Sequence, residues 1–216
     1  MVEQTQPQKP TTFFVAVDGS DASDDAFSYC RKDIMKTKRD YPEGQAFLHP
    51  ELYPCDDLVV GTIANHKKES YLPYNMKADY LQERYEAKVV EIGKHGRFAS
   101  REFNEEEKKT TKELIWELAE FEKSDIIVVG NHGRKGPRKD ETVCGTLVQY
   151  LALNNKFPVL IVKDYRPRTV KPDGCLRWGI CYDGSAKSKK AFGIVLNTMK
   201  QCDKLAVIHV KEDKKG

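Results

Sequence analysis

The stretch Asp125–Gly133, which reads DIIVVGNHG, decides the fold. A short apolar run ends there in two glycines that flank Asn131-His132. A basic segment follows, then Gly145-Thr146 with an apolar helical pattern, then the apolar run Pro158–Lys163. This order predicts strand, loop, helix and strand. Because glycines let backbone approach a ligand closely and a helix start can hold phosphate, the stretch predicts a nucleotide-binding site.

The same alternation extends over the whole chain. Strands are expected at residues 13–17, 58–64, 98–103, 125–130 and 157–163. Helices are expected at residues 20–35, at residues 77–94, after an Asn104 N-cap with Leu114, Ile115, Leu118 and Phe121 on the buried face, and along Val143–Asn154. Residues 40–54 are expected to form a long loop, and residues 65–76 an irregular segment. Alternating strands and helices predict a parallel sheet covered on both faces, with ligands beyond the carboxyl ends of its strands.

Composition sets limits on partners and location. The 216 residues suffice for one α/β domain with extra material, and 39% hydrophobic and 32% charged residues are typical of a globular protein. A net charge of +3 is too small to indicate nucleic acid or a membrane surface as a partner. We expect no membrane segment and no signal peptide. Six cysteines without a CxxC spacing indicate free thiols in a reducing cytosol, so the expected location is cytoplasmic.

An internal similarity links the two ends of the chain. Asp18–Phe27 and Asp183–Phe192 share Asp, Gly, Ser, Ser, Ala and Phe at matching positions, and Cys55–Leu58 matches Cys202–Leu205. We interpret the second set as a partial second copy of the strand–helix–strand opening. The predicted organisation is a flexible tail at 1–11, a main domain at 12–164, a linker at 165–175 and a partial repeat at 176–216.

The residues that carry chemistry gather around the glycines. Gly130 and Gly133 allow a tight turn, and Gly145 and Thr146 present N–H groups, with a hydroxyl from Thr146. Positive charge or donors come from His132, Arg134, Lys135, Arg138 and Lys139. The alternative is an ordinary strand–helix loop with solvated basic residues. The segment is neither a Walker loop nor a GxGxxG motif.

Asp18 follows the first predicted strand and is expected at the same crevice. Its carboxylate could accept a hydrogen bond from a ribose or help to hold a metal. A role as an Asx-turn or capping residue is the equally weighted alternative.

These motifs resemble the universal stress protein family. The resemblance is carried by Val15–Ser20, Asp125–Gly130, Gly130–Gly133 with Gly145-Thr146, and Pro158–Val162, and it resumes over residues 176–211. It implies a five-stranded parallel sheet with helices on both faces, of the adenine-nucleotide alpha-hydrolase-like type, with a C-terminal strand–helix–strand half-repeat. The family's nucleotide-binding branch carries Gly-x2-Gly-x9-Gly-Ser/Thr, whereas eleven residues separate Gly133 from Gly145 here.

The resemblance also implies a set of site residues. Asp18 would lie beside the ribose and phosphates and could help to hold a Mg²⁺ ion. The backbone near Ile63 would contact adenine. Glycines and neighbouring residues would hold the phosphates. The complete set is Val17, Asp18, Gly19, Ile63, Gly130, Asn131, His132, Gly133, Arg134, Gly145, Thr146 and Leu147. The family is usually dimeric through its last strand, an edge that the half-repeat could shield instead.

Three functions follow as hypotheses. The first is a stress-response regulatory or signalling module that binds ATP, or AMP or ADP. The second is a slow Mg²⁺-dependent ATP hydrolase that uses Asp18. The third is a nucleotide-free dimeric scaffold. No catalytic set of residues emerges from the sequence, so we expect a binding protein rather than an enzyme.

Overall fold

The computed structural model describes residues 9–37, 40, 54–136, 144–154, 156–171 and 173–209. They group into two compact units. The sheet unit comprises residues 9–35 and the described part of 55–165. The C-terminal unit comprises residues 36, 37, 40 and 54 with the described part of 166–209. Most of the predicted tail and nearly all of the predicted loop at residues 40–54 lie outside the described residues.

A five-stranded parallel sheet forms the centre of the sheet unit, in the order β3-β2-β1-β4-β5. Its strands are β1 (Thr12–Ala16), β2 (Asp57–Ala64), β3 (Gly96–Glu102), β4 (Ile126–Gly130) and β5 (Val159–Val162). β1 pairs in parallel with both β2 and β4, with Phe14 opposite Val59 on one side and Ile127 on the other. The predicted α/β fold with a parallel sheet is confirmed.

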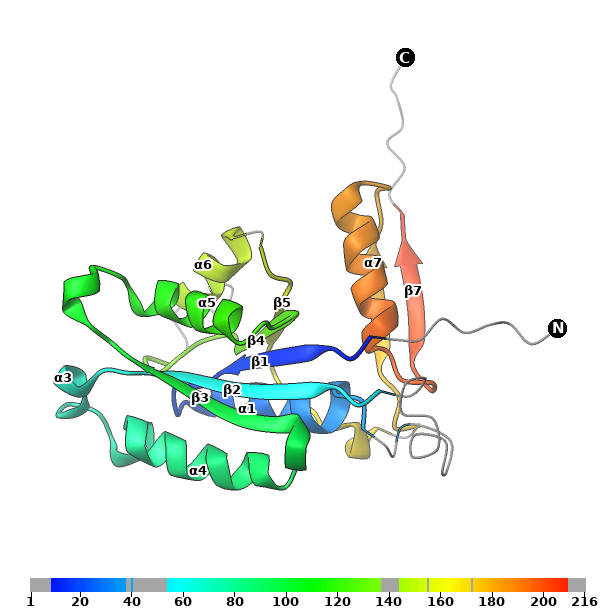
Figure 1. Ribbon diagram of the computed structural model, residues 1–216. Coiled ribbons are helices and arrows are strands. Elements are labelled where there is room, and N and C mark those ends of the chain that lie inside the picture. Colours follow the sequence, from blue (N-terminus) through cyan, green and yellow to red (C-terminus); the bar gives the residue numbers. More distant parts are fainter. Residues whose placement is uncertain are drawn as a thin grey trace, which may run out of the picture. The chain divides into compact units, whose positions relative to one another are not determined.

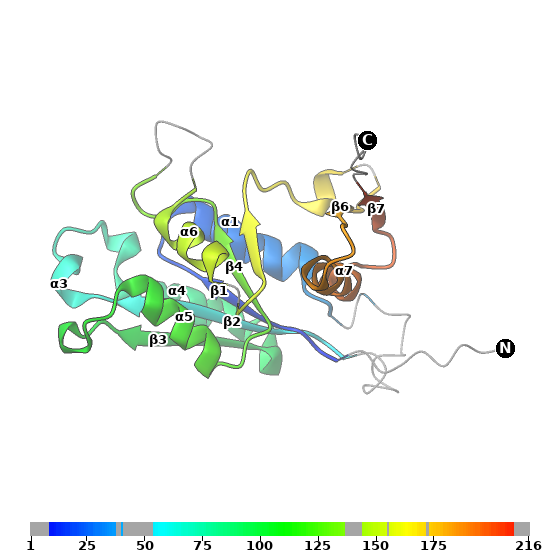
Figure 2. The same ribbon diagram turned by 90° about the horizontal axis from the view of Figure 1, so that it is seen from above.

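Helices cover both faces of this sheet (Figure 1). The helices are α1 (Asp21–Tyr29), α3 (His66–Glu69), α4 (Ala78–Val90), α5 (Thr111–Phe121) and α6 (Thr146–Leu153). In Figure 1, α1 and α4 lie below the sheet and α5 and α6 lie above it, and Figure 2 shows the same elements from above. Each strand contributes to the apolar core on both faces of the sheet, because successive side chains point to opposite faces. Phe14 and Ile127 pack with Leu114 and Leu151 under α5 and α6.

Three details of the sequence prediction were wrong. Asn104 caps only a short 3-10 turn, whereas the helix itself begins at Thr111. Thr110 and Glu113 form a reciprocal capping box there, which supplies both a side-chain acceptor and a return bond to the N-cap N–H. Phe121, expected on the buried face of this helix, is 80% exposed. The segment 65–76, expected to be irregular, contains the short helix α3 capped by Asn65 and a 3-10 turn at Tyr74–Met76.

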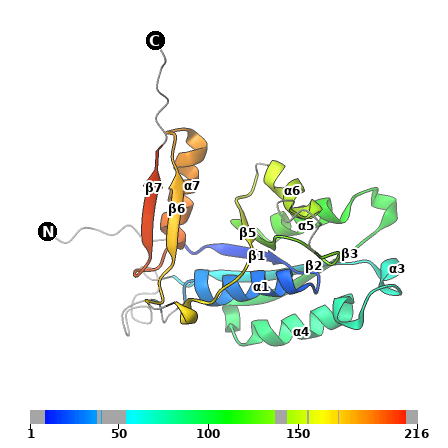
Figure 3. The ribbon, with the colours of Figure 1, turned by 180° about the vertical axis from the view of Figure 1, so that it is seen from behind.

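The C-terminal unit is a parallel strand pair with one helix. β6 (Arg177–Cys181) pairs with β7 (Lys204–Ile208), and α7 (Ala186–Thr198) connects them (Figure 3). This is the strand–helix–strand element that the sequence predicts. A 3-10 turn at Arg168–Val170 precedes it and places the buried Arg168 against Asp203.

Equivalent contacts recur in the two units at the positions of the sequence similarity. Ser20 and Ser185 are both N-caps, accepting from the N–H of Ser23 and Ser188, and Gly19 and Gly184 share a φ of 82°. The Asp18 and Asp183 carboxylates accept from the N–H of Ser20 and Ser185 at 3.1 and 2.9 Å. Asp56 and Asp203 accept from the N–H of Thr11 and Leu176 at 2.9 and 2.8 Å. The two segments therefore share equivalent hydrogen bonds as well as identical residues.

No helix among the described residues is long and apolar enough to cross a membrane.

Candidate functional site

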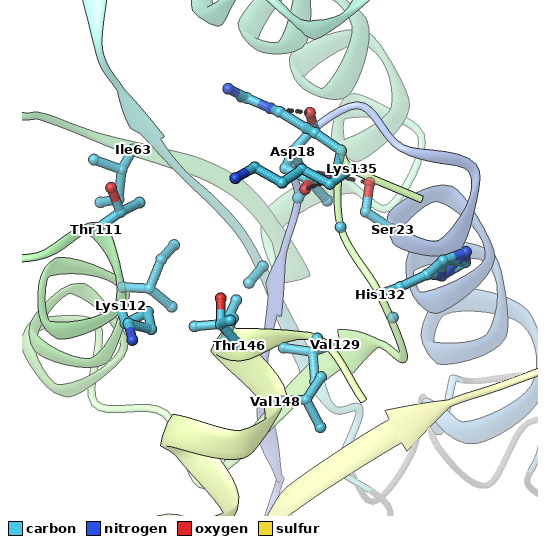
Figure 4. A pocket seen from close by; sticks show the side chains of 18 of the residues that line it. Asp18, Ser23, Ile63, Thr111, Lys112, Val129, His132, Lys135, Thr146 and Val148 are labelled. Carbon is cyan, nitrogen blue, oxygen red and sulfur yellow. Dashed lines mark hydrogen bonds between the residues drawn. The ribbon is translucent and has the colours of Figure 1, made fainter. Parts of the chain in front are cut away.

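A cavity opens at the carboxyl ends of β1, β2 and β4. Its volume is about 540 Å³, and residues that follow these strands line it together with the starts of α5 and α6 (Figure 4). β1 continues into α1 on one face of the sheet, whereas the chain after β4 reaches α6 on the other face. The cavity therefore lies at the topological switch point, where ligands bind in sheets of this kind.

Asp18 joins the two loops that meet at this point. Its Oδ1 accepts hydrogen bonds from the Ser20 N–H at 3.1 Å and the Ser20 hydroxyl at 2.6 Å. Its Oδ2 accepts from the Arg134 N–H at 2.9 Å, and its main-chain oxygen accepts from Arg134 Nε at 2.7 Å. The Asx-turn reading of Asp18 is thus correct, and the carboxylate also fixes the loop after β4 against the loop after β1.

Two of the motif glycines are required by packing inside the protein. A Cβ on Gly130 would lie 2.4 Å from the Ala22 main-chain oxygen, because α1 crosses β4 at close range. A Cβ on Gly133 would lie 2.7 Å from Asp18 Oδ2. Close backbone approach therefore explains both glycines, and at both positions the near neighbour is the protein itself.

The start of α6 offers unused N–H groups to the cavity. Its N-cap is Gly145, which provides no side-chain acceptor, and the Gly145 N–H bonds the Asn131 main-chain oxygen at 2.8 Å. The first intrahelical donor is the Gln149 N–H, which bonds the Gly145 oxygen at 3.0 Å. The N–H groups of Thr146, Leu147 and Val148 precede that bond and lie at the positive end of the helix dipole.

Positive side chains predominate around the cavity. The four lysines and arginines that line it are Lys68, Lys112, Arg134 and Lys135, whereas Asp18 is the one lining carboxylate among the described residues. Lys112 Nζ lies 5.7 Å from the centre of the Tyr150 ring, so this side chain reaches from α5 toward α6. Burial lowers the pKa of Arg134, but a guanidinium remains protonated at neutral pH. The field in the cavity therefore favours an anion.

Part of the cavity lining is apolar, and one strand there ends in unpaired backbone. Ile63, Ile115 and Val129 contribute aliphatic side chains to the lining. β2 pairs with β3 as far as Ala64, whereas its register with β1 stops at Gly61. The Thr62 hydroxyl covers the end of β1 by donating to the Val17 main-chain oxygen at 2.9 Å. The edge of Ile63 that faces β1 is consequently free of strand pairing and available to a planar ligand with donors and acceptors.

Ten of the twelve residues predicted for the site line this cavity. The two that do not are Gly19, packed beneath Asn75, and Asn131, whose Oδ1 lies 2.9 Å from His132 Nδ1. Figure 4 shows the His132 ring turned toward α1. Arg138 and Lys139 lie outside the described residues. Within the described part of the chain, no cluster of three or more acidic, histidine or cysteine side chains is arranged to hold a metal ion.

Sequence reasoning missed Lys68, Thr111 and Lys112, all of which line the cavity. Lys68 lies in the segment that was expected to be irregular. Thr111 and Lys112 open α5, whose N-cap was placed six residues too early, at Asn104 instead of Thr110. The Thr110-x-x-Glu113 capping box was the available signal, because this pattern marks a helix start.

No known family profile matches the sequence, and no curated protein matches it. Three similar solved structures are the hypothetical protein MJ0577, a universal stress protein in complex with cAMP, and a universal stress protein from Archaeoglobus fulgidus. Their identities to this chain are 16%, 19% and 14%, and their TM-scores are 0.48, 0.43 and 0.44. Each alignment covers 72% of this chain, and 97%, 98% and 99% of the respective structure. Two of these three structures are of universal stress proteins, the family that the motifs of this chain resemble.

Proposed function

We propose that the cavity binds an adenine nucleotide, with ATP as the principal ligand, and that binding serves regulation or signalling in a stress response. The observation that carries the proposal is the combination, in one cavity, of several cations and a free helix start with aliphatic side chains and free strand backbone. A nucleotide combines phosphates with a flat base in the same way.

Each part of the ligand has a proposed place in this lining. The base lies between Ile63, Ile115 and Val129 and bonds the free backbone edge of Ile63. The phosphates lie at the N–H groups of Thr146, Leu147 and Val148, within reach of Lys112 and Lys135 (Figure 4). The ribose lies near Val17 and Asp18. Oriented N–H groups at a helix start and nearby cations are the usual means of phosphate binding.

Asp18 bears on the choice between binding and hydrolysis. Both of its carboxylate oxygens already accept hydrogen bonds from Ser20 and Arg134. A Mg²⁺ ion at Asp18 would have to use the remaining lone pairs, with most of its ligands supplied by phosphates and water. This arrangement favours a binding module over a Mg²⁺-dependent hydrolase.

We expect the purified protein to bind ATP, with an affinity that falls in the order ATP, ADP, AMP, adenosine. Each phosphate removed takes away charge-assisted hydrogen bonds to the start of α6. Isothermal titration with each ligand, with and without Mg²⁺, measures the order, and GTP tests the base. Equal affinity for ATP and adenosine would contradict the placement of the phosphates. Absence of binding and of any thermal shift at millimolar ATP would favour the nucleotide-free scaffold.

Neutralising a cavity lysine is expected to weaken ATP binding about tenfold. Lys112→Gln or Lys135→Gln removes one charged donor to phosphate, and a hydrogen bond to a charged group contributes roughly 1.5 kcal/mol or more. Lys94→Gln is the matched control, because it removes the same charge from an exposed position outside the cavity lining. Titrations should show reduced affinity for ATP in the first two variants and unchanged affinity for adenosine in all three.

The shared contacts of the two units support a partial second repeat at residues 176–216. That repeat contains the Asp–Gly–Ser turn and its helix but, within this sequence, no counterpart of Gly130–Gly133 with Gly145-Thr146. β5, at an edge of the sheet, is the proposed route to a homodimer.

A further inference from the structure

Two cysteines face each other at the start of the strand pair in the C-terminal unit. The parallel register pairs Arg177 with Lys204, and the Lys204 N–H bonds the Leu176 main-chain oxygen at 3.0 Å. Cys175 and Cys202 each lie two residues before that first pair, in the segments that lead into β6 and β7. The side chains of Cys175 and Cys202 form a hydrogen bond with each other, so the two sulfurs are already in contact before any bond is made.

The two thiols interact, and they differ in access to solvent. Both cysteines are in the free thiol form. Cys202 is exposed, whereas Cys175 is 9% exposed and its thiol donates to the Asp173 main-chain oxygen at 3.0 Å. The contact with the Cys202 thiol, together with burial and nearby carboxylates, raises the pKa of Cys175 to about 11. A dissolved oxidant thus meets Cys202 first, and Cys175 is held protonated beside it.

Two charged side chains, Arg168 and Asp203, lie close to the Cys202 sulfur. Arg168 Nη1 lies 4.0 Å from Cys202 Sγ and also pairs with Asp203. Asp203 Oδ1 lies 3.8 Å from the same sulfur. The thiolate is the reactive form of cysteine. The Arg168 guanidinium, which carries only N–H donors, lies where it can donate to the leaving oxygen of an oxidant.

We propose that Cys202 and Cys175 form a reversible disulfide when the protein meets hydrogen peroxide, with Cys202 as the attacking and Cys175 as the resolving cysteine. The Cys202 thiolate attacks one peroxide oxygen, the O–O bond breaks, and hydroxide leaves and takes a proton to become water. Cys202 is now a sulfenic acid. The Cys175 sulfur then loses its proton and attacks the Cys202 sulfur, the S–O bond breaks, and a second water leaves. Two thiols are oxidised, and one hydrogen peroxide molecule is reduced.

The bond would close the ends of β6 and β7 that lie next to Arg168 and Asp203. It joins Cys175 to Cys202 around β6 and α7, so the strand pair would be covalently held where its hydrogen-bonded register begins. The ATP proposal concerns the sheet unit, so the disulfide stands or falls independently of it.

The test is a peptide map of the full-length chain. The reduced protein is treated with hydrogen peroxide, blocked with N-ethylmaleimide and digested with trypsin without reduction. We expect Thr169–Arg177 linked to Gln201–Lys204, at the summed peptide mass less two hydrogens, and two fewer maleimides on the intact chain. Dithiothreitol should break the link and restore both maleimide labels. Free Cys202 after peroxide, or Cys202 oxidised to sulfinic acid without the linked peptide, would overturn the proposal.

Three serine variants assign the roles. Cys181→Ser is the matched control, because Cys181 is an exposed thiol on β6, and it should leave the linked peptide unchanged. Cys175→Ser should abolish the link and let dimedone trap a sulfenic acid on Cys202. Cys202→Ser should abolish the link and leave Cys175 available to maleimide after peroxide. Cys202 joined instead to Cys181 or to a second chain in the wild-type protein would refute the pairing.

Discussion

Gly130→Ala is expected to lower the free energy of unfolding of the sheet unit by about 3 kcal/mol. The added Cβ would lie 2.4 Å from the oxygen, 2.5 Å from the carbonyl carbon and 2.8 Å from the Cβ of Ala22. Two of these atoms are helix backbone, so no side-chain rotation can relieve the contact. α1 would have to move away from β4, which opens the core under Ala26 and Phe27, both nearly inaccessible to solvent.

Urea unfolding followed by tryptophan fluorescence measures this effect in the correct unit. The chain has two tryptophans, Trp116 on α5 in the sheet unit and Trp178 on β6 in the C-terminal unit. In a Trp178→Phe background, fluorescence reports on the sheet unit alone. Gly179→Ala is the control for the same exchange in a strand, because its Cβ would meet Ile208 Cδ1 at an ordinary 3.9 Å. Equal stability of the Gly130→Ala variant and its parent would show that α1 can shift freely.

The surroundings of Gly130 show what the sequence alone can and cannot predict. The run Ile126–Val129 predicts a buried strand because its residues are β-branched and apolar throughout. The alternation of such runs with helical patterns predicts the parallel sheet, and β1 through β5 follow it. The pattern also marks Gly130 and Gly133 as places of close approach. It does not contain the identity of the neighbours, Ala22 and Asp18, because those contacts arise from the crossing of segments over 100 residues apart.

Some residues of the candidate site could be predicted from the sequence, and others could not. Residues adjacent to a strand end, such as Asp18 and Thr146, follow from the rule that parallel strands end at one edge of the sheet. Lys112 does not, because its place depends on where α5 starts. Asn104 and Thr110 are both good N-caps. Three glutamates follow Asn104 in the sequence, and acidic residues in a first turn favour a helix start there. The structure assigns those glutamates to a separate 3-10 turn, which Lys108 ends with a φ of 51°.

Asp203→Asn is expected to destabilise the C-terminal unit by about 3–5 kcal/mol, the range found when one partner of a buried ion pair is removed. The Asp203 side chain is fully buried and that of Arg168 is 10% exposed. The carboxylate also accepts from the N–H of Leu176 at 2.8 Å, from Trp178 Nε1 at 3.1 Å and from the N–H of Lys200 at 3.1 Å. An amide in its place removes the negative charge that faces Arg168 and turns one acceptor into a donor facing donors.

The same network makes the unit sensitive to acid. Burial by itself would raise the pKa of Asp203, but the Arg168 guanidinium and the donors of Leu176, Trp178 and Lys200 outweigh it and hold the pKa well below its usual range. The stabilisation is therefore complete above the unfolded-state pKa of about 3.9 and is lost as the pH falls below that value toward the folded-state pKa. Acid thus has the same effect as the amide substitution.

Trp178 fluorescence in a Trp116→Phe background tests both predictions, because the Trp178 indole donates to Asp203 itself. Urea titrations at neutral pH should show the early transition of Asp203→Asn. Between about pH 5 and pH 2, the parent should lose stability steeply, and the variant, which has no carboxyl to protonate at this position, should lose less. Asp173→Asn is the control, since its partner Lys204 lies 4.0 Å away and both side chains are exposed, so a change of about 1 kcal/mol or less is expected. If the two variants were equally stable, the Arg168–Asp203 pair would contribute no more than a surface ion pair, and the hydrogen-bonded start of β6 and β7 would have to be maintained by the backbone register alone.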